Sequence, residues 1–150
     1  MDLEKLINED IKTAMLARNA EKLEALRAIK AAILLEKTKE GTTGEMSESV
    51  ALKILQKLVK QRKESADIYA AAGRKDLADK ELTDAAIIEK YLPQQMSPEE
   101  ITLVIKQLIT QAGTTSIKEM GKIMGLASKE LAGKADNKMI SEIVKQLLSA

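Results

Sequence analysis

The residues best suited to binding chemistry lie in the last third of the chain, where glycines and lysines are interspersed among apolar residues. Gly121 and Gly125 stand four residues apart inside a helical pattern, although a glycine within a helix costs about 1 kcal/mol relative to alanine. Their spacing places them on one side of a helix and indicates close approach to bare backbone. Lys122 lies between them, and Lys129 and Lys134 follow. One explanation is an RNA-binding site at these five residues, where the glycines open the backbone to a phosphate and the lysines contact it.

A neighbouring helix packed against the glycines is the simpler explanation of the same pattern. Small residues four apart allow two helix backbones to approach closely. The two interpretations are compatible, because one glycine can pack against a helix while the lysines face outward.

A second basic cluster lies near the middle of the chain, where no acidic residue occurs between Ser49 and Lys63. Its members are Lys53, Lys57, Lys60, Arg62 and Lys63. The lysines follow one another at helical spacing and occupy one flank of a helix, across about 120°. Charge runs are usually solvated helix faces, but such faces normally include interleaved acids. A secondary stripe that binds a polyanion is therefore an equal alternative.

Two residue types that often carry catalysis are missing. The chain has no cysteine and no histidine, which excludes thiolate nucleophiles, disulfides and zinc sites built on those residues. The phosphate-binding loop of nucleotide hydrolases is also absent. Adjacent acids such as Glu99 and Glu100 lie at predicted helix starts, where they oppose the helix dipole favourably. We expect no catalytic residues, no metal and no cofactor, and we lean away from an enzyme.

The overall charge and the aromatic content restrict how the chain can bind nucleic acid. The net charge is only +1 and aromatic residues make up 1% of the chain, namely Tyr69 and Tyr91. A polyanion site must therefore be local, and base stacking, which needs aromatic side chains, is disfavoured. The first residues do not resemble a signal peptide, and no apolar run is long enough to span a bilayer. These features predict a soluble, cytoplasmic protein.

The apolar periodicity predicts an all-α protein with two domains. Residues 1–92 read as a four-helix bundle, with helices at about 2–18, 21–40, 48–72 and 76–91, a left-handed stop at Asn19 and a turn at 41–44. Residues 93–96 are a linker, and residues 97–150 form a three-helix domain. Its first helix begins with Ser97 as N-cap, Pro98 at the first position and Glu100 three residues after the cap. Its second helix is expected from after Ser116 to about Leu131, and its third from after Asp136.

Three segments together resemble the YqeY-like family: residues 91–101 (YLPQQMSPEEI), residues 120–125 (MGKIMG) and residues 133–136 (GKAD). The resemblance extends over the whole chain. Residues 97–150 also resemble the tail domain of GatB, a subunit of the glutamine-dependent tRNA amidotransferase, in which the tail helps to hold the tRNA. The resemblance implies an all-helical fold with a bundle and a small C-terminal domain. It also implies tRNA or another structured RNA as partner, with Lys122, Lys129 and Lys134 as contacts.

Three functions follow from these observations. The leading hypothesis is a non-catalytic, translation-associated module that binds structured tRNA through backbone phosphates. The second is a protein–protein accessory factor of a tRNA amidotransferase or an aminoacyl-tRNA synthetase. The third, a carbon–nitrogen ligase with glutamine as amido-N donor, rests on the family name alone, because no residue here supports that chemistry. The sequence leaves the oligomeric state open.

Overall fold

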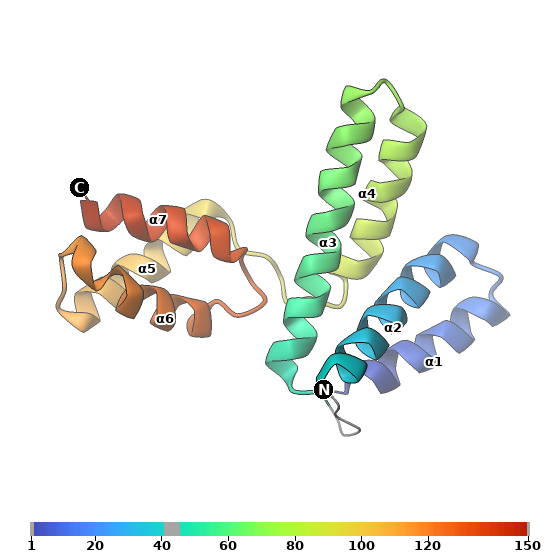
Figure 1. The fold of residues 1–150 in the computed structure, drawn as a ribbon, viewed down its shortest axis with the longest axis horizontal. Helices are drawn as coiled ribbons and strands as arrows, with labels where there is room; N and C mark the ends of the chain where they lie inside the picture. The colour runs from blue at the N-terminus through green and yellow to red at the C-terminus, as the bar shows by residue number, and fades with distance from the viewer. Residues whose placement is uncertain (1, 41–45, 150) are drawn as a thin grey trace. The chain divides into compact units, whose positions relative to one another are not determined.

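The computed structural model describes residues 2–40 and 46–149, and in this part of the chain all regular structure is helical (Figure 1). The all-α prediction is confirmed; the turn expected at 41–44 lies outside the described residues. The elements are α1 (Leu3–Leu16), α2 (Ala20–Glu40), α3 (Glu48–Ala71), α4 (Lys75–Glu89), α5 (Pro98–Ala112), the 3₁₀ helix η1 (Ile117–Glu119), α6 (Met120–Glu130) and α7 (Asn137–Ser149). The helices belong to two compact units, the first ending at Leu92 and the second beginning at Pro93.

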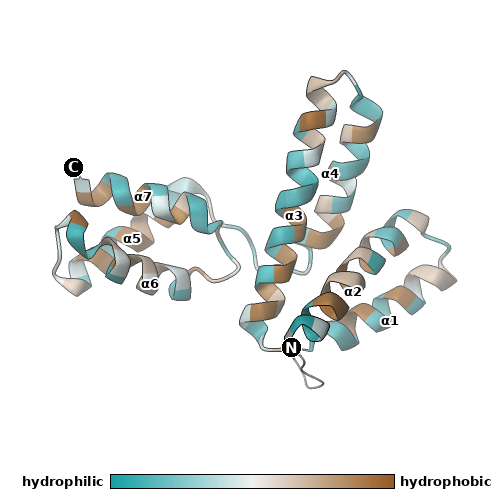
Figure 2. Cartoon of the chain, viewed as in Figure 1, coloured by the Kyte–Doolittle hydropathy of each residue, from teal (hydrophilic) through white to brown (hydrophobic). Residues whose placement is uncertain are grey.

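The first unit consists of two antiparallel hairpins, α1–α2 and α3–α4, which meet along α2 (Figure 1). Side chains from all four helices share one hydrophobic core. Its fully buried members include Leu26, Ile29 and Ile33 of α2, Leu55 of α3 and Ile88 of α4. Brown and teal bands alternate along these helices in Figure 2, as expected for helices with one apolar and one solvated side.

The connection between α1 and α2 differs from the prediction in one residue. Arg18, rather than Asn19, adopts the left-handed conformation, with φ of 54°. The Asn19 amide donates to the Ala14 carbonyl at 3.0 Å, and the Asn19 Oδ1 accepts from the Lys22 amide at 3.1 Å. Asn19 therefore begins the second helix instead of ending the first, because its side chain satisfies an amide that has no intrahelical partner.

Helix α4 buries a carboxylate that the sequence pattern did not indicate. Asp84 is only 4% exposed, whereas the apolar Leu82 on the same helix is 47% exposed. Burial of the Asp84 carboxyl raises its pKa and is the largest effect. The nearby Arg62 lowers that pKa. Glu24 and Glu81 raise it and Lys80 lowers it, each more weakly than Arg62 does. The side of α4 that faces its neighbours centres on Ala78, Ala85 and Ile88, which leaves Leu82 at the edge of the contact.

Tyr91, just after α4, ties that helix to α1. Its hydroxyl donates a hydrogen bond to the Asp10 carboxylate, and its ring packs against the core of the first unit. Burial, together with the neighbouring Asp10 carboxylate, raises the pKa of Tyr91 far above its ordinary value. The hydroxyl therefore remains a donor throughout the physiological pH range.

The second unit packs α5, α6 and α7 around its own core, which includes Ile101, Ile105, Ile123 and Val144, all 0% exposed. The predicted start of α5 is confirmed. The Ser97 hydroxyl accepts from the Glu100 amide at 3.2 Å, and Pro98 is the first helical residue. Among the described residues, no helix is both long and apolar enough to cross a membrane.

The helix predicted from after Ser116 is divided into η1 and α6. The Ser116 hydroxyl accepts from the Lys118 amide at 3.2 Å, and the Ser116 carbonyl accepts from the Glu119 amide at 3.0 Å. These bonds close a tight 3₁₀ turn rather than a first α-helical turn, so α6 begins only at Met120.

Replacing Tyr91 by Phe removes the bond to Asp10 without removing the buried ring. We expect the free energy of unfolding to fall by about 1.5 kcal/mol, since the lost bond is to a charged group. Tyr69→Phe is the matched control, because Tyr69 has no hydrogen bond from its hydroxyl within the described part of the chain. Urea unfolding followed by circular dichroism measures both; equal effects of the two changes would contradict the assigned role of Tyr91.

The raised pKa of Asp84 predicts a pH-dependent effect of Asp84→Asn. The ionised carboxylate is less favourable in the folded than in the unfolded chain, so wild-type stability falls as the pH rises from the ordinary aspartate pKa through the raised value. Asparagine cannot ionise. The variant should therefore be more stable than wild type at about pH 7, with the gain disappearing at about pH 3. Urea midpoints at both pH values test this, and a loss of stability at neutral pH would show that the Arg62 interaction dominates.

Candidate functional site

The packing of α6 determines which of its residues reach solvent. Ile123 and Ala127 are 0% exposed and belong to the core shared with α5 and α7. The opposite side of the helix is open. It carries four of the residues predicted for RNA binding, all exposed: Gly121, Lys122, Gly125 and Lys129. We call these four residues the α6 face.

Within the described residues, neither a close contact nor the backbone conformation requires glycine at Gly121 or Gly125. A Cβ atom added at Gly121 or Gly125 would meet no heavy atom within 4 Å, and neither residue has a positive φ. No helix of the second unit therefore packs against either glycine, so the simpler explanation of the sequence pattern has no support within that unit. The cost of two glycines in a helix is not offset by internal packing.

Lys122 and Lys129 lie close together on the α6 face. Seven residues separate them, which corresponds to about 20° around the helix and about 10 Å along it. Neither lysine forms an ion pair within residues 2–40 and 46–149, where all observed pairs belong to the first unit. Their charges are therefore available to a partner.

Lys134 is not on α6 but in the loop that follows it, where it is exposed. The linker holds this loop in place. The Gln95 side chain donates to the carbonyls of Gly133 at 2.7 Å and Pro93 at 2.9 Å, and the Met96 amide donates to the Lys134 carbonyl at 2.9 Å. This positioning role of Gln95 was not predicted, since a linker residue outside any apolar periodicity gives no signal of it.

Two apolar side chains near the glycines are also exposed and were not predicted as part of the site. Leu126 of α6 is 41% exposed and Ile117 of η1 is 45% exposed. Leu126 lies three residues after the buried Ile123 but outside the stripe formed by Met120, Ile123 and Ala127. A helical projection of residues 120–130 would have shown this.

Two residues of the predicted basic stripe on α3 form ion pairs with acids of α4. Arg62 lies 3.5 Å from Glu81, and the Lys63 ammonium lies 2.6 Å from Glu89. The prediction that the stripe lacks acids holds along α3 but not in space, because α4 supplies them. Lys53, Lys57 and Lys60 remain exposed and without an ion pair in the described part of the chain.

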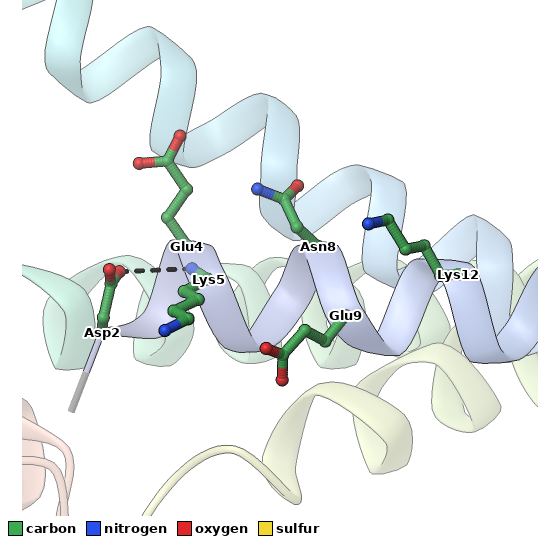
Figure 3. A pocket seen from close by; sticks show the side chains of 6 residues that line it. All are labelled: Asp2, Glu4, Lys5, Asn8, Glu9 and Lys12. Atoms are coloured by element: carbon green, nitrogen blue, oxygen red, sulfur yellow. Dashed lines mark hydrogen bonds between the residues drawn. The ribbon is translucent and has the colours of Figure 1, made fainter.

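A depression of about 390 Å³ lies along α1 (Figure 3). Its lining comes from one helix and carries both signs of charge: Asp2, Glu4, Lys5, Asn8, Glu9 and Lys12. Glu4 is already paired with Lys37, and Asp2 accepts from the Lys5 amide. No group of three carboxylates among the described residues could hold a metal ion. We assign no reaction to this surface.

Comparison with known proteins identifies the family. A family model described as Yqey-like protein matches residues 4–148. This chain belongs to the YqeY-like family. Among YqeY-like relatives, "Altered inheritance of mitochondria protein 41, mitochondrial" of Meyerozyma guilliermondii is 32% identical over 148 residues, covering 95% of this chain and 74% of the relative. Its namesake in Saccharomyces cerevisiae is 32% identical over 128 residues (80% and 67%), and that of Pyrenophora tritici-repentis is 25% identical over 148 residues (96% and 80%).

The names of these YqeY-like relatives correct the predicted location. We expected a cytoplasmic protein, but the three fungal relatives are named as mitochondrial proteins. Composition and hydropathy do not distinguish one aqueous compartment from another. The relatives' name states no reaction or ligand.

The open surroundings of Gly125 predict that alanine is tolerated there. Gly125→Ala should raise the free energy of unfolding by about 0.5–1 kcal/mol, because the helix gains propensity and no atom is displaced. Gly113→Ala is the matched control. Gly113 also has open space around it but has φ of +69°, so the same substitution should destabilise. Urea midpoints measure both, and destabilisation by Gly125→Ala would mean that this side of α6 is not open.

Proposed function

We propose that this YqeY-like protein is a non-catalytic module that binds structured RNA, tRNA in particular, through phosphate contacts made by the α6 face. One observation carries the proposal. Within the described residues, a solvent-facing helix surface presents two glycines that no contact requires, together with two lysines that form no ion pair. An external partner that approaches the backbone closely and carries negative charge accounts for both features.

Phosphate contact fits these side chains better than base recognition does. A-form RNA is recognised largely by its shape and backbone, which requires cations but no aromatic platform. Tyr91 is half-buried with its hydroxyl bonded to Asp10, and Tyr69 is half-buried on α3. Neither tyrosine lies in the second unit, so the α6 face has no aromatic ring on which a base could stack.

The resemblance of residues 97–150 to the GatB tail supports tRNA as the first RNA to test. The absence of cysteine and histidine supports a binding role rather than amide transfer, because the usual thiol nucleophile is missing. The carbon–nitrogen ligase reading therefore ranks last. An assay of ammonia release from glutamine with charged tRNA and ATP tests it directly.

The exposure of Ile117 and Leu126 favours a second candidate, an accessory factor that docks on a tRNA amidotransferase or aminoacyl-tRNA synthetase. Protein interfaces of this kind bury apolar side chains at their centre, so the interaction would tolerate salt. Phosphate contacts release counterions, so RNA binding would weaken steeply with salt. Leu126→Ser should abolish a protein interaction while leaving a phosphate-driven one largely intact.

The decisive test is fluorescence anisotropy with bulk tRNA across a salt series. Four to six phosphate contacts, three of them by Lys122, Lys129 and the exposed Lys134, predict that log K falls against log salt with a slope near −3 to −5. Lys122→Glu with Lys129→Glu should weaken binding by about tenfold or more at about 0.1 M salt and make the slope shallower by about 2.

Lys138→Glu with Lys145→Glu provides the matched control. These lysines are also exposed, also seven residues apart and also on one helix of the second unit, α7, so the change in net charge is identical. The control should weaken binding by less than about threefold. Equal losses in the two variants would remove the α6 face as the site, and no binding by wild type at low salt would remove the proposal.

A further inference from the structure

Helix α3 carries its basic residues on two different sides, and one of these sides is available to a partner. Arg62 and Lys63 are paired with acids of α4. Lys53, Lys57 and Lys60 are all exposed and form no ion pair in the described ranges. Two of these five cations are therefore paired within the fold, and the other three face solvent. We call Lys53, Lys57 and Lys60 the lysine ladder.

The lysine ladder has a fixed and compact geometry. Its members lie within about 60° around α3, and Lys53 and Lys60 are about 10 Å apart along the helix. Leu55 and Val59, at 0% and 7% exposure, hold the opposite side of α3 in the core. The ladder repeats the seven-residue spacing of Lys122 and Lys129 on the α6 face.

We infer that the lysine ladder is a second phosphate-contact surface for the same RNA, an inference that rests on the proposed function. No acid interrupts the ladder along α3 until Glu64. Its charge is therefore complementary to a polyanion.

The ladder lacks the exposed apolar side chains that many other interaction surfaces bury. No large apolar side chain is exposed between residues 49 and 61. Amphipathic helices that insert into a membrane, and the centres of most protein interfaces, bury such side chains. RNA phosphates require only the ammonium groups that the ladder supplies.

Two contact surfaces on one chain increase the affinity for an RNA that both can reach. The eight residues between α4 and α5, 90–97, extend over at most about 28 Å. When one surface is bound, this short connection keeps the other at high effective concentration near the same RNA. Loss of either surface should therefore weaken binding strongly, although each contributes few contacts.

Lys53→Glu with Lys60→Glu tests the inference in the full chain, with bulk tRNA and anisotropy across a salt series. We expect binding at about 0.1 M salt to weaken by about tenfold or more, and the salt slope to become shallower by about 2. Circular dichroism monitors folding. Lys53→Gln with Lys60→Gln, which adds no acid, should produce the same change of slope.

The matched control is Lys5→Glu with Lys12→Glu on α1. These lysines are exposed and seven residues apart, but they are interleaved with Glu4 and Glu9 (Figure 3). The control should weaken binding by less than about threefold. Equal losses in the ladder and control variants would overturn the inference, since only net charge would matter.

The outcome also separates this inference from the proposed function. If the Lys122 and Lys129 variant loses affinity and the ladder variants do not, the ladder is not a contact and the α6 face remains one. If the ladder variants alone lose affinity, the ladder is supported and the α6 face is not the site. If wild type does not bind tRNA at low salt, both fail.

Discussion

The burial of Ile123 and Ala127 determines which side of α6 faces solvent. Once these two side chains enter the core between α5 and α7, the orientation of α6 is fixed and its glycines and lysines must face solvent. Binding residues on a rigid helix can be held in register without being part of the core themselves. The same logic applies to α3, where Leu55 and Val59 are buried and the lysine ladder lies opposite.

The two units differ in whether their charged side chains form ion pairs. In the first unit, ion pairs join α1 to α2, α2 to α4 and α3 to α4, so much of its charge is used within the fold. On α6, Lys122 and Lys129 form no ion pair with any described residue, and Gly121 and Gly125 weaken the helix although no described side chain packs against them. Features that cost stability and lack an internal explanation are those expected at a contact surface.

The local signals in the sequence predicted local structure well and spatial neighbours poorly. The start of α5 followed from Ser97, Pro98 and Glu100, because a cap needs only residues within one helical turn. The sequence did not show that Glu81 and Glu89 would neutralise Arg62 and Lys63, since those acids come from another helix. Whether Gly121 and Gly125 are covered by another helix also depends on tertiary contacts. Within the second unit both are open to solvent.

We propose that RNA phosphates contact the exposed side of α6, close to the helix backbone at its two glycines. An amide-resolved NMR titration of the full chain with tRNA at low salt tests it most directly, because every residue reports separately. We expect the largest shifts at Gly121, Lys122, Gly125 and Lys129, and we expect them to disappear on addition of salt. Shifts confined to the outer side of α7, or shifts that persist in high salt, would contradict it.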